Sequence, residues 1–347
     1  MNKHPWYEKR NRDKTLLLVE GHHEKEKLFK LILMCFPEIK IKMEDIIIYK
    51  TNIYVLYDKL KREYADEADL WYEADINLPY LIKRDTGEEL NARDITNIIL
   101  IFDYERQDAG FKKHKIVELQ KCFNDVNGNG KLYINYPMVE SYMHLKTIPD
   151  PTYKDLCESV TVGKIYKNKV KNMPVSKLLK LPQNLNETLE ERYGISDKTI
   201  REQCMDNILK LSVPDNELLD ELERIFTEIV DDKSRRTLIN QFAFEMKKWR
   251  KNGNNISYVA YMREILQQVI IHNLCKASYI QNGIYNIDEE QYIEILEALN
   301  PEKIVEKQNE ASGEHGEGYI WVLNMSVLFA AEYSPHYFFE NIAWNIT

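Results

Sequence analysis

The chain has 347 residues, and its 47 Lys and Arg against 56 Asp and Glu give a formal net charge of −9, which argues against a protein that coats nucleic acid by bulk charge. Only 12 Gly and 11 Pro, with 44% hydrophobic and 30% charged residues, favour a helix-rich globular protein of about two domains. The longest apolar runs, Leu31–Phe36 and Val327–Ala331, are too short for a membrane span, which needs about 18 residues.

Short apolar runs alternate with amphipathic segments over the first 150 residues. Continuous apolar runs, typical of parallel strands buried on both faces, predict strands at Thr15–Val19, Asp45–Tyr49, Asn97–Phe102 and Lys131–Asn135. Helical spacing predicts helices between them at His22–Phe36, Asn52–Tyr64 and Lys112–Phe123, and the acid-rich residues 65–96 are interpreted as an insertion. This alternation predicts an α/β fold with a parallel sheet flanked by helices.

The β pattern fades beyond residue 150, which predicts an α/β domain over 1–150 and a helical domain over 151–347. Helical periodicity recurs over 187–193, 197–211, 216–230, 233–251, 256–280, 289–299 and 320–333. The segment Ser159–Lys180 is basic and contains no acid. It is either a solvated helix face or a surface that contacts phosphates of nucleic acid through Lys164, Lys167, Lys169 and Lys171.

Acidic residues follow three of the predicted strands. The first strand ends in Glu20-Gly21, the third in Asp103-Tyr104-Glu105, and Glu140 follows the fourth. The carboxyl ends of parallel strands share one edge of a sheet, so these acids should gather there, with Asp103 and Glu105 on one side of an extended strand end. Gathered carboxylates need a neutralising cation, and oxygen ligands suit Mg²⁺ or Mn²⁺. The alternative is that the acids only cap or complement the helices that follow.

The segments LLLVEG and ILIFDYE, in this order and about 80 residues apart, resemble the Toprim domain found in topoisomerases, primases and OLD-type nucleases. The resemblance covers roughly residues 13–146. It implies that Glu20 is the family's general acid/base or metal-binding glutamate, and that Asp103 and Glu105 are its Asp-x-Asp pair, with Glu in place of the usual second Asp. YPMVESYMHL and GYIWVLNMSVLFAAEY are similar to segments of stand-alone Toprim proteins from anti-phage defence loci.

The resemblance implies a Mg²⁺- or Mn²⁺-dependent endonuclease that cuts DNA or RNA, such as tRNA. Glu20, Asp103 and Glu105 would be catalytic, and these three with Glu140 would hold the metal. The sequence has no GxGxxG or Walker A motif, so the ATPase of such a defence system would be a separately encoded partner that docks on the helical half; a homodimer is the other assembly considered for the active form.

Five dispersed cysteines and the absence of an apolar stretch behind the basic N-terminus favour a cytoplasmic location, with no membrane partner. The alternative function is a non-catalytic interaction protein, in which a Toprim-like scaffold docks a partner.

Overall fold

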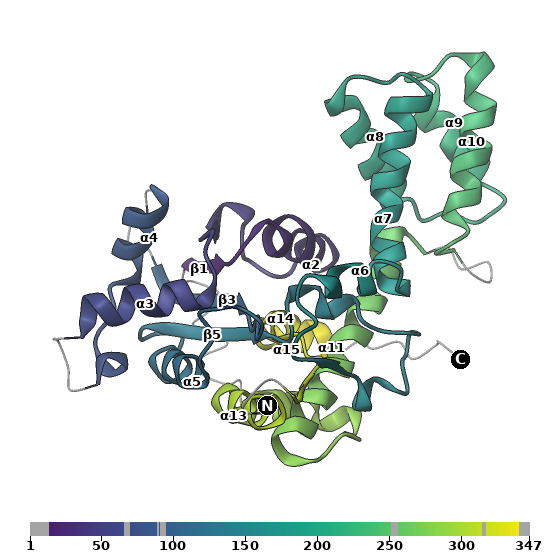
Figure 1. Cartoon of the computed structure of the whole chain (residues 1–347). Helices are drawn as coiled ribbons and strands as arrows, with labels where there is room; N and C mark the ends of the chain where they lie inside the picture. The colour runs from purple at the N-terminus through teal and green to yellow at the C-terminus, as the bar shows by residue number, and fades with distance from the viewer. Residues whose placement is uncertain are drawn as a thin grey trace. The chain divides into compact units, whose positions relative to one another are not determined.

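The computed structural model describes residues 14–65, 70–88, 90, 95–250, 256–313 and 317–339 (Figure 1). The chain forms two compact units, one comprising 1–170 with 267–347 and the other comprising 171–266. This division differs from the predicted boundary near residue 150. The segment from Gln267 on belongs to the unit that holds the five-stranded sheet, and one of its helices packs against the last parallel strand of that sheet.

The first unit contains a five-stranded sheet in the order β2-β1-β3-β5-β4. The strands β1 (Lys14–Val19), β2 (Ile46–Ile48), β3 (Ile95–Asp103) and β5 (Gly130–Asn135) are parallel, and the short edge strand β4 (Asn124–Asp125) is antiparallel. Leu17, Leu100 and Leu132 in the three central strands are fully buried, as expected for strands covered on both faces. The predicted α/β class and its four parallel strands are confirmed.

Helices connect these strands at the predicted places. His22–Phe36 contains a π-helical turn, Glu24–Phe29, that continues into α2 (Lys30–Cys35). The helices α3 (Ile53–Tyr64) and α5 (Lys113–Cys122) agree with the prediction. The predicted insertion contains a 3₁₀ turn, Trp71–Glu73, and α4 (Leu78–Thr86); residues 66–69, 89 and 91–94 of it lie outside the described residues.

The C-terminal part of the first unit packs on the sheet. It contains α12 (Tyr292–Glu297), α13 (Pro301–Ala311), α14 (Met325–Tyr333) and α15 (Pro335–Phe339). Strand β7 (Tyr319–Trp321) pairs with β6 (Cys157–Ser159), Leu323 bridges to Tyr136, and α14 packs against β5 (Figure 1). The predicted helix over 320–333 is therefore wrong at its start, where the chain is extended.

The second unit is helical. It contains α7 (Pro174–Glu187), a π-helical turn (Thr188–Arg192), α8 (Lys198–Lys210), α9 (Leu218–Phe226), α10 (Asp232–Met246) and the start of α11 (Tyr258–Asn282). The buried rings of Phe226 and Phe242 join α9 to α10, with centroids 5.1 Å apart. In neither unit does a described helix have the length and apolar character needed to cross a bilayer.

Candidate carboxylate site

Glu20 and Asp103 meet where two adjacent parallel strands end. Glu20 directly follows β1, and Asp103 is the last residue of β3. The backbone N–H of Asp103 donates a hydrogen bond of 3.1 Å to Oε2 of Glu20. The sequence therefore placed these two acids correctly at one edge of the sheet, as the parallel strand order requires.

Glu105 does not continue the extended strand, contrary to the expectation for the Asp103–Glu105 pair. Its backbone has a φ of +35°, in the left-handed region that non-glycine residues rarely occupy. The N–H of Glu105 donates to the carbonyl of Pro137 at 3.3 Å, which holds this turn. Local backbone strain of this kind costs on the order of 1–3 kcal/mol and is often found where a side chain must be held for function.

Glu24 is a fourth acid at this edge, and it was not among the predicted site residues. It lies in the first turn of the π-helical segment after β1, and its side chain is 3% exposed. The N–H of Gly21 donates to Oε2 of Glu24 at 3.0 Å, so the turn after β1 directs this carboxylate back toward the strand end. The signal was its place in the first turn of the predicted helix from His22, which is separated from the first strand by only two residues.

Glu140 comes from the 3₁₀ segment Val139–Met143, which follows β5. Its side chain is 3% exposed, and Oε1 lies 3.3 Å from Nδ1 of His23 and 3.1 Å from Nζ of Lys167. The other oxygen, Oε2, is buried and has no hydrogen-bond partner among the described residues. A buried carboxylate oxygen without a partner costs free energy. Oε2 of Glu140 could therefore accept a donor or bind a cation.

Glu20, Glu24, Asp103, Glu105 and Glu140 are called the carboxylate cluster below. Burial and repulsion by Glu105 raise the pKa of Glu20 to about 8, despite the hydrogen bond from Asp103. Burial, followed by the charges of Glu20 and Glu24, raises the pKa of Asp103 well above its usual range. Burial also raises the pKa of Glu24 and Glu105. The surroundings therefore do not stabilise all of these carboxyl groups in their ionised form at once, and Glu20 keeps its proton up to a pH of about 8.

The neighbouring histidine does not neutralise the cluster. Burial lowers the pKa of His23 to about 4, even though Glu140 favours its charged form. The imidazole is therefore neutral at physiological pH, and its 3.3 Å contact with Glu140 is not a lasting ion pair.

Asn135, at the end of β5, orients Asp103. Its Nδ2 donates to Oδ1 of Asp103 at 3.4 Å, while its Oδ1 accepts from the N–H of Ser326 at 3.1 Å and from Oγ of Ser326 at 2.9 Å. These two donors leave the amide of Asn135 one orientation, with its NH₂ group toward the carboxylate. Ser326 lies in α14, so the C-terminal part of the chain helps to build this site.

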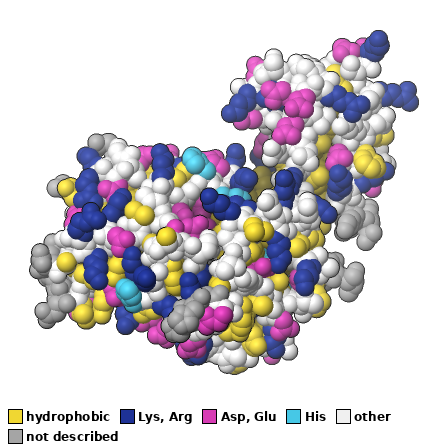
Figure 2. Space-filling model, viewed as in Figure 1, with side chains coloured by type: hydrophobic (Ala, Val, Ile, Leu, Met, Phe, Trp, Pro, Cys, Tyr) yellow, Lys and Arg dark blue, Asp and Glu magenta, His cyan; other side chains and the backbone are white. Residues whose placement is uncertain are grey.

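The lysines of the basic segment Ser159–Lys180 lie in different environments. Lys167 pairs with Glu140, and Lys169 pairs with Glu158; both acids are buried. Lys164 is exposed and its charge favours the ionised form of Glu105, whereas Lys171 belongs to the second unit. On the face shown in Figure 2, Lys and Arg are interspersed with Asp and Glu rather than gathered in one basic patch. Glu140 and Glu158, which lie outside the basic segment, therefore neutralise part of its positive charge.

The donor set fits Mg²⁺ or Mn²⁺ in its chemistry, because the cluster supplies only carboxylate oxygens and includes the free Oε2 of Glu140. In the described part of the chain, however, no three Asp, Glu, His or Cys side chains are placed to hold a metal ion as they stand.

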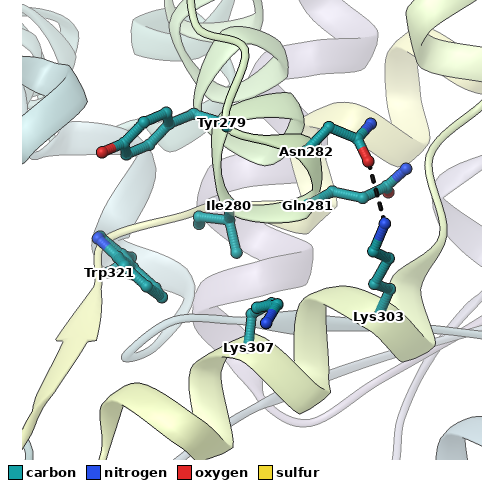
Figure 3. Close-up of a pocket in the computed structure, with 8 residues that line it drawn as sticks. Tyr279, Ile280, Gln281, Asn282, Lys303, Lys307 and Trp321 are labelled. Atoms are coloured by element: carbon teal, nitrogen blue, oxygen red, sulfur yellow. Dashed lines mark hydrogen bonds between the residues drawn. The ribbon is translucent and has the colours of Figure 1, made fainter.

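A hollow of about 580 Å³ lies between the end of α11, α13 and β7 (Figure 3). Tyr279 and Trp321 line it, together with Lys303 and Lys307. Both cations already have partners, since Lys303 donates to Oδ1 of Asn282 at 3.1 Å and Lys307 lies 2.7 Å from Glu310. The lysines of this hollow are thus already engaged by neighbouring side chains.

The chain matches no protein-family model, no curated protein and no solved structure.

Proposed function

We propose that this chain is a Toprim-like endonuclease that cleaves phosphodiester bonds of DNA or RNA with the help of Mg²⁺ or Mn²⁺. The observation that carries the proposal is the meeting of Glu20 and Asp103 at adjacent parallel strand ends, joined by the 3.1 Å hydrogen bond. Glu24, Glu105 and Glu140 add carboxylates to the same electrostatic cluster. The parallel order β2-β1-β3-β5 supports the resemblance to Toprim domains.

In this proposal Asp103, Glu105 and Glu140 hold the cation, and Asn135 keeps the Asp103 carboxylate in place. A bound divalent cation supplies positive charge for the scissile phosphate and acidifies water. Glu20 accepts the Asp103 N–H on one oxygen, which leaves its other oxygen to take or give a proton. Because the backbone of Glu105 is in the left-handed region, the position of its carboxylate is not set by the side-chain alternation of β3.

The proposed partners are nucleic acid and a separately encoded ATPase. Among the aromatic residues after position 150, Trp249, Phe242 and Phe329 are buried. Phe244 of the second unit is 65% exposed, and Leu219 and Ile200 are 49% and 42% exposed. The first unit also exposes apolar side chains, such as Ile165 at 71%, so the second unit is proposed as the docking surface for the ATPase because it is helical and holds no member of the carboxylate cluster.

The second candidate is a non-catalytic interaction protein. It is favoured by one observation: the cluster has no ready-made metal geometry, and Lys167 already neutralises Glu140. The two proposals differ in a direct assay. Purified chain is incubated with plasmid DNA, single-stranded DNA and total tRNA, with Mg²⁺, Mn²⁺ or excess chelator. Cleavage that requires the cation supports the nuclease, and uncut substrates under every condition, with and without the ATPase, favour the interaction protein.

A further inference from the structure

Lys167 is a positively charged residue that interacts with several members of the carboxylate cluster. It belongs to α6 (Ile165–Val170), and its Nζ lies 3.1 Å from Oε1 of Glu140. Its positive charge also stabilises the ionised forms of Glu20, Glu24 and Glu105. Partial burial opposes the charge of Lys167, but attraction to Glu140, Asp103 and Glu24 outweighs burial and raises the pKa of this lysine.

The two partners of this ion pair differ in their freedom to move. The Lys167 side chain is 55% exposed, whereas that of Glu140 is 3% exposed. A lysine has a flexible four-carbon stem, so its ammonium can turn into water with little loss of hydration. Glu140 cannot leave in this way, and its Oε2 remains without a partner among the described residues while Lys167 occupies Oε1.

A single ammonium is also a poor match for the whole cluster. It carries one positive charge beside five carboxyl groups, and its Nζ lies within ion-pair distance of one oxygen, Oε1 of Glu140. A divalent cation would neutralise more charge and would accept several oxygens at once. A carboxylate oxygen that binds the ammonium of Lys167 is less available to bind a metal ion, so the two cations compete for Glu140.

We propose that Lys167 is a tethered counter-ion that occupies the place of the divalent cation in the cation-free protein and is displaced when that cation binds. The inference rests on the proposed function, because it takes the carboxylate cluster as the cation site. The divalent cation must then break the Lys167–Glu140 contact in order to bind. The affinity of the chain for this cation is therefore lower than it would be if Lys167 were absent.

Lys169 provides a matched control on the same helix. It forms an ion pair with Glu158, whose side chain is 6% exposed, and its own side chain is 47% exposed. Glu158 also lies 3.9 Å from Nδ1 of His144 and is not a member of the carboxylate cluster. Lys167 and Lys169 therefore share an exposed stem and a buried acidic partner, but only Lys167 touches the cluster.

The test is calorimetric titration of the cation-free full chain with Mn²⁺, with no nucleic acid present. Wild type is compared with Lys167→Met and Lys169→Met, and thermal unfolding of each protein is recorded without cation. Both variants should unfold at a lower temperature than wild type, because each leaves a buried acid without its partner. Lys167→Met should bind Mn²⁺ at least fivefold more tightly, a typical coupling between competing ligands, and Lys169→Met should bind as wild type does.

Each outcome is decisive. Equal or weaker Mn²⁺ binding by Lys167→Met overturns the exchange, as does an equal gain in Lys169→Met. If wild type binds Mn²⁺ but Lys167→Met shows no gain, only the role of Lys167 is wrong and the proposed metal site stands. If none of the proteins binds Mn²⁺, the metal site itself is wrong. Should Lys167→Met fail to fold, Lys167→Gln removes the charge while keeping a polar end, and the same criteria apply.

Discussion

The N–H of Asp103 and the carboxylate of Glu20, which are 83 residues apart in sequence, are joined by a hydrogen bond at the ends of β3 and β1. This bond lies between adjacent parallel strands and therefore follows from the sheet order β2-β1-β3-β5. It fixes one oxygen of Glu20 beside Asp103, whose own carboxylate is held by Asn135. The proposed chemistry depends on these two acids being held together against their mutual repulsion.

The stability of the cation-free protein should fall as pH rises from 6.5 to about 8. The pKa of Glu20 is about 8 in the folded protein and near 4.5 when unfolded, so the folded state holds the extra proton in this window. When the folded state binds one proton more than the unfolded state, the free energy of unfolding falls by up to about 1.4 kcal/mol for each unit of increase in pH. His23 has a lowered pKa of about 4 and gives the opposite slope only below pH 6.5. Urea unfolding at several pH values measures this dependence.

Glu20→Gln should flatten that pH dependence. Glutamine keeps an oxygen for the N–H of Asp103 but carries no charge, so the repulsion by Glu105 no longer acts on this position. We expect a cation-free protein at least as stable as wild type at pH 8, and a smaller rise in melting temperature on addition of Mg²⁺. Glu158→Gln is the control, since it removes a buried acid outside the cluster. An unchanged pH slope in Glu20→Gln would show that Glu20 is not the titrating group.

Ser326→Ala should weaken the site through Asn135. It removes the 2.9 Å hydrogen bond to Oδ1 of Asn135 and leaves only the N–H of residue 326 to orient that amide. The loss of one buried hydrogen bond costs on the order of 1 kcal/mol of stability. If Asn135 positions Asp103, the variant should also lose several-fold in kcat at unchanged KM. Ser141→Ala is the matched control, because Ser141 is fully buried and bonds Asn324 instead of Asn135; an equal loss of kcat in both would count against positioning.

Lys164 should contribute more to nucleic-acid affinity than Lys169. Lys164 is exposed, whereas Lys169 is engaged by Glu158. Each lysine that contacts a phosphate releases counter-ions, so Lys164→Ser should lower the slope of log affinity against log salt by about one. Lys169→Ser should change the slope less and the stability more. Fluorescence anisotropy with labelled DNA and RNA at several salt concentrations compares them, and equal slopes in wild type and Lys164→Ser would mean that this residue only faces solvent.

Phe244→Ser should leave the fold intact and weaken the contact with the ATPase. The ring is 65% exposed on α10, so its removal should change the unfolding free energy by less than about 0.5 kcal/mol. Co-purification of the full chain with the product of a neighbouring ATPase gene measures the contact. Leu238→Ser, in the buried face of the same helix, should instead destabilise the second unit. Undiminished co-purification of Phe244→Ser would place the docking surface elsewhere.

The sequence predicted the sheet better than the site. Long apolar runs such as Asn97–Phe102 define buried parallel strands, and the acids that follow them must lie at one edge. Glu20, Asp103 and Glu140 could therefore be predicted. Asn135 and Ser326 could not be paired, because their contact joins positions 191 residues apart and leaves no local pattern. The domain boundary was missed for the same reason, since the segment after Gln267 returns to the first unit.

The cation-dependent carboxylate site is tested by nucleic-acid cleavage with wild type and Asp103→Asn, in Mg²⁺ and in excess chelator. Asparagine preserves the shape of the side chain but removes the charge that would hold the cation beside Glu20. We expect cleavage by wild type in Mg²⁺, none in chelator, and a loss of at least a hundredfold in folded Asp103→Asn. Cleavage by Asp103→Asn at the wild-type rate, or cleavage by wild type in excess chelator, would contradict a cation-dependent carboxylate site.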